Sequence, residues 1–312
     1  MIKIYKVFID GKEGTTGLQI FERFKNRNDI ELITISDDLR KDINAKKEII
    51  NNVDYVFLCL PDQFAKESVS LIDPRNSHVK IIDASTAHRT NPNWAYGFAE
   101  LSSKHRQNIK DSKRVAVGGC YASGFIAMCY PLVEHKIILN SHLITSYGIS
   151  GYSGGGKAMI KEYEENPKEY ISPRFYALNQ NHKHLPEMKY ITGLINAPVF
   201  NPIVDDFYSG MVVNIPLHVS SLNKKLSAKE LQAIFQDHYA NQSLLEVMPF
   251  SEDTGFMNTH KLANTSKMQI YVYGNQEQIL LSARFDNLGK GASGSAIQCM
   301  NIMMGIDETT GL

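Results

Sequence analysis

The chain has 312 residues, 43% of them apolar, and its 33 lysines and arginines balance its 33 aspartates and glutamates. This length and composition predict a soluble globular protein of about two domains. The balanced charge excludes an overall field that would attract DNA or an anionic membrane. No apolar run reaches the ~18 residues of a membrane span, and the N-terminus lacks the features of a signal peptide. We therefore expect a cytoplasmic protein with no nucleic-acid or membrane partner.

Residues 2–85 alternate regularly between strands and helices. Apolar strands are expected at 2–10, 30–36, 53–60 and 79–85, and helices at 15–27, 39–52 and 61–72. The run 53–60 is almost continuously apolar, which is typical of strands buried on both faces of a parallel sheet. Strand–helix alternation at this spacing predicts right-handed crossovers and a Rossmann-like, doubly wound α/β domain.

The rest of the chain has a different pattern. Residues 86–101 are predicted to be irregular, and a strand at 114–120 is expected to run into a helix at 121–133. Longer strands follow at 142–150 and 210–220, with a hairpin at 268–285 that turns near Gly274–Asn275. A helix at 227–239 opens on the capping-box pair Ser227 and Glu230. We predict a second α+β domain with a mixed, mainly antiparallel sheet, and then a glycine-rich loop that enters a last helix within 289–306.

A glycine-rich turn follows the first strand. The sequence DGKEGTTG places Gly11, Gly14 and Gly17 at G-x-x-G-x-x-G spacing before an amphipathic helix. Glycines allow a tight turn whose backbone approaches a pyrophosphate at the helix N-terminus. The position between strand and helix predicts a dinucleotide site, which would also include Thr15 and Thr16; the alternative is a turn without a ligand.

The end of the second strand bears on the choice of cofactor. NAD sites place an Asp or Glu there to bind the ribose 2′-hydroxyl. Here the strand is predicted to end at Ser36, and Arg40 and Lys41 follow. A hydroxyl and nearby cations suit a 2′-phosphate and favour NADP(H). Asp37 and Asp38 weigh against this interpretation, and solvated surface charge is the alternative for the two cations.

Cys120 differs from the other cysteines in its setting. Two glycines precede it and the apolar sequence YASGFIAMCYPLV follows, so it lies at or just before a helix N-terminus. The partial positive charge at that end stabilises a thiolate. Cys59, Cys129 and Cys299 are interpreted as core residues. The spacing of the four cysteines predicts neither a disulfide framework nor a metal site.

A nucleophilic cysteine needs a proton partner, and the sequence NHKHLPEM offers His182 and His184. In an extended chain, an H-x-H pair projects both rings to one side. We favour His184 as the acid/base, with His182 as the alternative, and no third His or Cys accompanies the pair to suggest a metal. Pro186 is expected to end the extended segment, and Glu187 to orient a ring or to begin a helix. His218, on a later strand, is a candidate for the same cleft.

Six segments, in this order, resemble the shorter form of N-acetyl-gamma-glutamyl-phosphate reductase. They are VFIDGKEGTTGLQI, DASTAHRTNPNWAYGFAEL, GCYASGFIA, SGYSGGGK, HKHLPEM and DNLGKGASGSAIQ. The resemblance covers nearly the whole chain. It implies an enzyme of arginine biosynthesis, a homo-oligomer, that binds NADP and reduces an acyl phosphate to an aldehyde. It also implies a cysteine nucleophile and a histidine acid/base, which fall on Cys120 and on His184 or His182.

Further roles follow from the resemblance. It implies that Ser85 and Arg89 line the active site, with Arg89 as an anion binder. The return segment 287–294 would meet the nicotinamide half of the cofactor, through Asn287, Gly289, Lys290 and Gly291. We also expect substrate contacts from Glu187, from His218, and from Ser153 and Lys157 of SGYSGGGK, for which an exposed glycine-rich loop is the alternative.

The expected domains are an NADP-binding domain, 1–118 with 288–312, and a catalytic and dimerisation domain, 119–287. Two segments depart from the family pattern. Val117 and Gly118 stand where the family has Asn-Pro before Gly-Cys, and Ala99 stands where proline is usual. The first departure bears on the thiol pKa and the rate more than on the type of reaction.

The hypothesis is that the Cys120 thiolate attacks N-acetyl-glutamyl 5-phosphate and phosphate leaves. NADPH then reduces the thioester to the semialdehyde, with His184 supplying the proton. One alternative is another acyl-phosphate or semialdehyde dehydrogenase, of the aspartate-semialdehyde or aminoadipyl type. The other is a non-catalytic NADP-binding protein.

Overall fold

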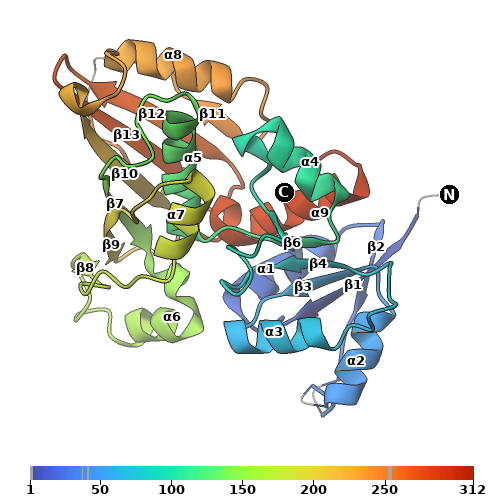
Figure 1. Ribbon diagram of the computed structural model, residues 1–312. Coiled ribbons are helices and arrows are strands. Elements are labelled where there is room, and N and C mark those ends of the chain that lie inside the picture. Colours follow the sequence, from blue (N-terminus) through green and yellow to red (C-terminus); the bar gives the residue numbers. More distant parts are fainter. Residues whose placement is uncertain (1–2, 37, 41, 252–254) are drawn as a thin grey trace. The chain divides into compact units, whose positions relative to one another are not determined.

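The computed structural model describes residues 3–36, 38–40, 42–251 and 255–312. The chain forms two compact units, Met1–Gly118 with Ala292–Leu312, and Gly119–Gly291 (Figure 1). Among the described residues, no helix has the length and apolar character needed to cross a membrane.

The first unit is built on a six-stranded sheet. Its strands are β1 (Tyr5–Asp10), β2 (Ile30–Ile33), β3 (Tyr55–Leu58), β4 (Lys80–Asp83), β5 (Ala95–Tyr96) and β6 (Arg114–Ala116). Their spatial order is β2-β1-β3-β4-β6-β5, and every neighbouring pair is parallel. The predicted doubly wound parallel sheet is confirmed.

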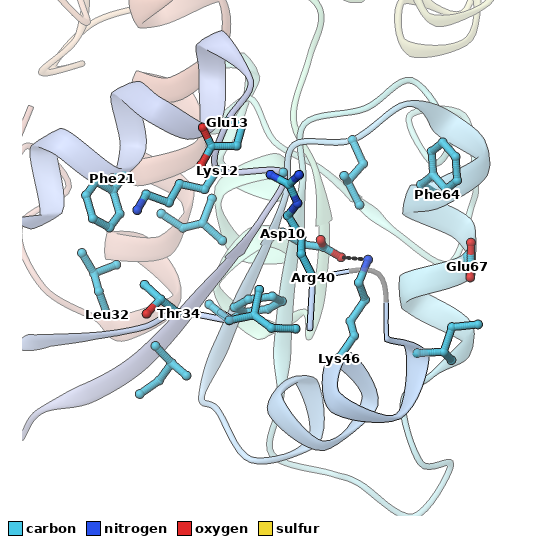
Figure 2. A pocket seen from close by; sticks show the side chains of 17 residues that line it. Asp10, Lys12, Glu13, Phe21, Leu32, Thr34, Arg40, Lys46, Phe64 and Glu67 are labelled. Atoms are coloured by element: carbon cyan, nitrogen blue, oxygen red, sulfur yellow. Dashed lines mark ion pairs between the residues drawn. The ribbon is translucent and has the colours of Figure 1, made fainter. Parts of the chain in front are cut away.

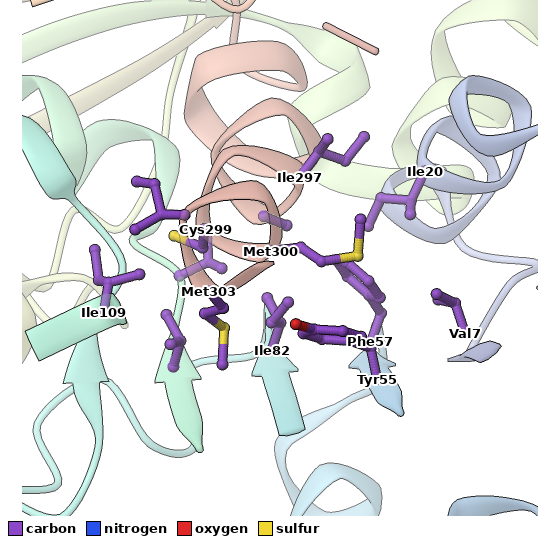
Figure 3. Close-up of a cluster of buried hydrophobic side chains, with 14 of the residues drawn as sticks. Val7, Ile20, Tyr55, Phe57, Ile82, Ile109, Ile297, Cys299, Met300 and Met303 are labelled. Atoms are coloured by element: carbon purple, nitrogen blue, oxygen red, sulfur yellow. The ribbon is translucent and has the colours of Figure 1, made fainter. Parts of the chain in front are cut away.

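Helices cover both faces of this sheet. They are α1 (Thr15–Phe24), α2 (Ile43–Asn51), α3 (Asp62–Ser70), α4 (Ser103–Asp111) and α9 (Gly294–Met304). Side chains alternate across a strand, so Val7 packs in a cluster with residues of α1, α4 and α9, whereas Phe8 packs with residues of α2 and α3. Figure 3 shows the first cluster, in which Met300 of α9 lies over Phe57 of β3. The C-terminal helix thus completes the core of the first unit.

The second unit contains a seven-stranded sheet. Its strands are β7 (Thr145–Gly151), β8 (Arg174–Phe175), β9 (Val199–Asp205), β10 (Met211–His218), β11 (Leu245–Val247), β12 (Met268–Gly274) and β13 (Gln278–Phe285). The order is β11-β12-β13-β10-β7-β9-β8. The pairs β7–β9 and β11–β12 are parallel and the other four are antiparallel. The predicted mixed, mainly antiparallel sheet is confirmed.

Helix α5 (Cys120–Glu134) is the core element of this unit. It packs on β10 and β13, while α7 (Leu185–Thr192) packs on α5 and α8 (Ala228–His238) on β12 and β11. Gly124 of α5 lies so close to Val213 and Phe285 that a Cβ there would come within 2.8 Å of both side chains. The predicted apolar stripe belongs to a helix that is buried on almost every side.

Several elements escape the sequence pattern. Strands β8 and β9 and the helix α6 (Gly156–Glu165) were not predicted, and α7 was expected only as one of two options for Glu187. The strand predicted at 114–120 ends at Ala116, and the segment predicted to be irregular contains β5 and a short helical turn, Ala99–Leu101. Strands β5 and β8 have only two residues each, and Pro202 interrupts the apolar pattern of β9. The stability of these strands therefore comes from their neighbours rather than from their own periodicity.

Candidate active site

Cys120 is the first residue of α5, and Gly119 is the N-cap with extended backbone. The residue is half-buried, whereas Cys129 and Cys299 are buried. The backbone amides and the helix dipole at this end favour an anionic sulfur. Burial raises the pKa of the Cys129 thiol, and burial with the neighbouring carboxylates of Asp83 and Asp10 raises that of Cys59. Cys120 is therefore the cysteine whose surroundings suit a nucleophile.

Two imidazoles lie close together beside the start of α5. The rings of His182 and His184 are 4.7 Å apart, centre to centre, and lie 6.0 and 6.4 Å from the ring of Tyr121, which follows Cys120. The backbone N–H of His184 donates to Nδ1 of His182 at 3.1 Å. Both histidines are more than nine-tenths buried. The structure thus brings the predicted pair together, next to the residue after the predicted nucleophile.

The local geometry of the pair differs from the predicted extended segment. His184 is the N-cap of α7, and Pro186 lies in its first turn, so the proline begins the helix. Proline suits this position because the first amides of a helix have no internal acceptor. Glu187 is also in the first turn, and its Oε1 accepts the backbone N–H of Gly119 at 2.9 Å. Glu187 therefore positions the residue before Cys120; a substrate contact for it stays a prediction.

Burial, followed by the charge of Lys183, lowers the pKa of His182 from 6.5 to about 4. The ring is therefore neutral near pH 7, and because Nδ1 accepts from His184, the proton resides on Nε2. A group that is so rarely protonated is a poor general acid at neutral pH. This argues against His182 as the general acid, and the acid role of His184 stays a prediction.

The lowered pKa of His182 predicts a loss of stability in acid. Between about pH 6.5 and pH 4 the unfolded chain binds a proton that the folded chain does not. The free energy of unfolding therefore decreases as the pH is lowered through this range. We expect this decrease in the free energy of unfolding to reach about 3 kcal/mol at pH 4. Urea unfolding of wild type and His182→Gln at pH 7 and 4.5 tests it, since the variant should lose less stability. The exposed His78→Gln is the control, and equal losses in His182→Gln and wild type would contradict the assignment.

The segment 176–182 adds residues that the sequence did not reveal. Burial and the charge of Cys120 raise the pKa of Tyr176, whose hydroxyl is hydrogen-bonded to that of Tyr121. Ala177 and Gln180 have positive φ, of 50° and 56°. The Gln180 amide both donates to and accepts from the backbone of Phe200, at 3.0 and 2.9 Å. These two hydrogen bonds hold a strained turn between Tyr176 and His182, and both of these rings lie beside Tyr121, the residue after Cys120.

The loop after β13 also meets the nucleophile. A Cβ on Gly291 would lie 2.8 Å from Cβ of Cys120, so only glycine fits there. The Asn287 side chain accepts from the Gly210 N–H at 2.9 Å and donates to Ser153 Oγ at 3.0 Å. Asn287 and Ser153 thereby tie three loops together, and Lys290 is almost fully buried. Cofactor and substrate contacts for these residues stay predictions.

The first unit contains the predicted phosphate loop. Gly11 has φ of +87°, a backbone conformation that favours glycine. A Cβ on Gly17 would lie 2.4 Å from the Gly11 carbonyl oxygen. Thr15 and Thr16 open α1, with Gly14 as its N-cap. The tight turn and the free helix start fit a pyrophosphate group.

A pocket of about 560 Å³ adjoins this loop (Figure 2). Asp10, Lys12, Thr34, Arg40 and Lys46 supply polar groups to its lining, and Phe21, Leu32 and Phe64 supply apolar surface. Its size and mixed lining fit the adenosine half of a dinucleotide.

The residues after β2 differ from the prediction. The strand ends at Ile33, so Thr34 takes the place predicted for Ser36 and lines the pocket. Ser36 is exposed and lies outside the lining. Arg40 does line the pocket, as a site for a 2′-phosphate requires. Lys41 and Asp37 lie outside the described residues.

We expect Gly17→Ala to lose most affinity for dinucleotides. The added methyl group meets backbone atoms of Gly11 and Lys12 at 2.4 and 2.9 Å, which forces the loop to move and costs about 1–3 kcal/mol of stability. Titration with NADPH and thermal unfolding measure the two effects. Gly14→Ala is the steric comparison within the same loop, because its nearest contact is 3.3 Å, and it should lose less affinity than Gly17→Ala. Equal binding by the two variants would contradict the role of the loop.

Ser85 and Arg89 lie beyond the carboxyl end of β4. The buried Asp83 carboxylate accepts from the Ser85 N–H and hydroxyl, both at 2.9 Å, and contacts Nδ1 of His88 at 2.6 Å. Arg89 donates to the carbonyls of Val117 and Ala84, at 2.8 and 3.0 Å. These contacts give both residues a positioning role at the strand ends, and their contact with substrate stays a prediction. The sequence offered no signal for the Asp83–His88 pair.

One predicted substrate residue, His218, is not brought to Cys120. His218 is exposed at the far end of β10, opposite Gln278, whereas Met211 at the near end pairs with Phe285, from which the chain leads to Gly291. The antiparallel register therefore separates His218 from the site by the length of the strand. Lys157 is exposed in the first turn of α6, and its contact with substrate stays a prediction.

Comparison with known proteins relates this geometry to a family. Residues 15–110 match the profile "Semialdehyde dehydrogenase, NAD binding domain", and residues 120–287 match "Semialdehyde dehydrogenase, dimerisation domain". N-acetyl-gamma-glutamyl-phosphate reductase 2 of Nostoc sp. is 42% identical, over 98% of this chain and 99% of its own. The chain belongs to the N-acetyl-gamma-glutamyl-phosphate reductase family. The reductase of Rhizobium meliloti is also 42% identical, over 96% of this chain and 98% of its own.

Solved structures agree with the fold of this reductase family member. Aspartate semialdehyde dehydrogenase of Francisella tularensis has a TM-score of 0.73 at 14% identity, covering 96% of this chain and 100% of its own. The Vibrio cholerae aspartate semialdehyde dehydrogenase II has a TM-score of 0.71 at 13% identity, covering 97% and 99%. At these identities the likeness concerns the fold alone. The match to an NAD-binding profile indicates a nicotinamide cofactor.

The departure from the reductase family pattern has a structural outcome. Val117 stands where the resemblance places asparagine, and its side chain is fully buried in the cluster of Figure 3. The position therefore contributes apolar packing in place of an amide. The backbone carbonyl of Val117 still accepts from Arg89 at 2.8 Å.

Proposed function

We propose that the chain catalyses the NADPH-dependent reduction of N-acetyl-L-glutamyl 5-phosphate to N-acetyl-L-glutamate 5-semialdehyde, with release of phosphate. The observation that carries this proposal is a half-buried cysteine at the start of a buried helix, beside two imidazoles. The chain is also 42% identical, over nearly its full length, to N-acetyl-gamma-glutamyl-phosphate reductase 2 of Nostoc sp.. The unit Gly119–Gly291 would carry the chemistry, and the unit that contains the glycine loop would hold the cofactor.

The first step is assigned to Cys120. Its thiolate attacks the acyl carbon, the carbon–oxygen bond to phosphate breaks, and phosphate leaves with the electron pair. The product is a thioester on the sulfur. Phosphate is a good leaving group, so the tasks of the protein are to ionise the thiol and to align it. The Glu187–Gly119 contact and the close fit of Gly291 hold the start of α5 for this purpose.

The second step needs a proton at the former carbonyl oxygen. The nicotinamide cofactor, when bound, supplies the hydride to the thioester carbon. His184 donates a proton to the oxygen, which gives a thiohemiacetal. It takes that proton back as the carbon–sulfur bond breaks, and this step releases the aldehyde and restores the thiolate. Backbone N–H groups at the start of α5 stabilise the developing negative charge on that oxygen.

Steady-state assays of the reverse reaction test the proposal. N-acetyl-glutamate semialdehyde, phosphate and NADP should give NADPH, and omission of phosphate should abolish turnover. Aspartate semialdehyde and the aminoadipyl analogue are the comparison substrates. A higher kcat/KM with either of them would reassign the substrate while leaving the reaction type intact. No turnover with any of the three would overturn the enzyme assignment.

Arg40 is proposed to select NADP over NAD. Loss of a charge-assisted hydrogen bond costs about 1.5–3 kcal/mol of binding free energy. Arg40→Ala should therefore raise the Kd for NADPH about 10- to 100-fold. The Kd for NADH should change little. Fluorescence titration measures both, and Arg75→Ala, which removes an exposed arginine outside the pocket, is the control. Parallel losses for both dinucleotides would contradict a 2′-phosphate contact.

We further propose a cytoplasmic homo-oligomer. Residues 120–287 match a dimerisation-domain profile. The sheet face opposite α5 also carries the half-buried side chains of Tyr271, Tyr273 and Leu280. Such an apolar surface suits contact with a second copy. Light scattering should give at least twice the monomer mass, and a monomer at micromolar concentration would contradict the proposal.

A further inference from the structure

A buried carboxylate lies directly under the phosphate loop. Asp10 ends β1, immediately before Gly11, and is 6% exposed. Its Oδ2 accepts from Ser68 Oγ at 2.6 Å and pairs with Lys46 Nζ at 3.1 Å (Figure 2). Both Asp10 and Lys46 line the pocket of the first unit.

This position is unfavourable for a negative charge. In doubly wound sheets, ligands bind outside the carboxyl ends of the strands, and the carboxyl end of β1 receives the pyrophosphate. A bare carboxylate there would repel a polyanion, and little water is present to screen a buried charge. The ion pair with Lys46 therefore affects the repulsion between Asp10 and a bound polyanion as well as the stability of the loop.

Other charges of the pocket do not replace this pair. Lys12 lies over the ring of Phe21, with Nζ 3.7 Å from its centre. Arg40 is exposed, and Glu13 and Glu67 add negative charge to the lining. A comparable arrangement exists at the end of β4, where the buried Asp83 is paired with His88 at 2.6 Å. Both Asp10 at the end of β1 and Asp83 at the end of β4 are thus paired with a basic side chain of the same unit.

We propose that Lys46 is a positioning residue of the cofactor site, which neutralises Asp10 so that the phosphate loop accepts a dinucleotide. The inference rests on the proposed nicotinamide cofactor. Lys46 acts through Asp10, so it affects NADPH and NADH alike, whereas Arg40 distinguishes between them.

Dinucleotide titrations of five proteins test this proposal, with Kd measured for NADPH and NADH by fluorescence. Lys46→Met leaves Asp10 uncompensated and should weaken both about 10- to 100-fold. Lys46→Arg should bind nearly as wild type. Lys47→Met, which removes an exposed charge from the same helix outside the pocket, is the matched control and should not change either Kd.

The decisive test removes the Asp10 carboxylate together with the Lys46 ammonium. Asp10→Asn/Lys46→Met carries no charge at the pair and should bind both dinucleotides within about threefold of wild type, which a merely structural role of Lys46 does not predict. Thermal unfolding of each variant without cofactor verifies that it is folded. Lys46→Arg keeps the proposal testable if Lys46→Met does not fold, because it retains the charge in a different shape.

Three results would overturn the inference. They are failure of the double variant to recover binding, a loss confined to NADPH, which would make Lys46 a direct 2′-phosphate ligand, and weak binding by Lys46→Arg equal to that of Lys46→Met. A wild-type chain that binds neither dinucleotide would instead overturn the proposed cofactor, and the inference with it.

Discussion

Cys120→Ser is expected to lower kcat/KM by about a thousandfold or more, as losses of a covalent nucleophile generally do. A serine hydroxyl is not ionised near neutral pH, and the helix start that favours a thiolate does not make it a comparable nucleophile. The assay is phosphate-dependent NADP reduction with N-acetyl-glutamate semialdehyde. Retention of more than a few per cent of activity would rule out covalent catalysis at this residue.

Two controls accompany this variant. Cys299→Ala changes a buried cysteine of α9 in the first unit and should keep its activity. Alkylation by iodoacetamide near neutral pH should label Cys120 first in the wild-type chain, because burial raises the pKa of the Cys59 and Cys129 thiols. Protection of Cys120 by substrate would connect its reactivity with the active site.

The second large effect is expected at His184. His184→Asn should lower kcat by about 10²–10⁴-fold, the usual range for a lost general acid or base. His182→Asn should have a smaller effect, because His182 is neutral near pH 7 and uses Nδ1 to orient His184. Pre-steady-state assays separate the steps, since the phosphate burst from acyl phosphate should survive in His184→Asn while aldehyde formation is slowed.

The pair provides its own matched control. Both rings are buried and both contact Tyr121, so a general packing defect would affect the two variants alike. A larger loss in His182→Asn than in His184→Asn would reverse the assignment. Equal losses accompanied by equal falls in unfolding temperature would assign both rings a packing role.

Local patterns predicted the elements that have their own periodicity. The apolar runs of β1, β3 and β4, their alternation with helical segments, and the spacing of Gly11, Gly14 and Gly17 sufficed for the parallel sheet and its loop. The hairpin turn near Gly274 and the capping box at Ser227 were also predicted, and both are confirmed. Short elements such as β5 and β8 escaped, because neighbours rather than their own sequence stabilise them.

The candidate site was predictable only where one residue's chemistry depends on adjacent residues. Cys120 was found because its glycines and its helix are contiguous with it. Tyr176 was missed because nothing near it in sequence marks it, and it meets Tyr121 and the charge of Cys120 only through folding. His218 was wrongly predicted to lie in the site, because the sequence of a strand does not reveal at which end of the sheet a residue lies.

The sequence by itself determined the fold class, the phosphate loop and the helix start that carries Cys120, because hydrophobic periodicity and glycine placement act over a few residues. Only the tertiary structure decided that Glu187, 68 residues away, holds Gly119. The same is true of the pairing of Lys46 with Asp10 and of the separation of His218 from the nucleophile. Contacts of this kind depend on strand order and register, which arise from the packing of the whole chain.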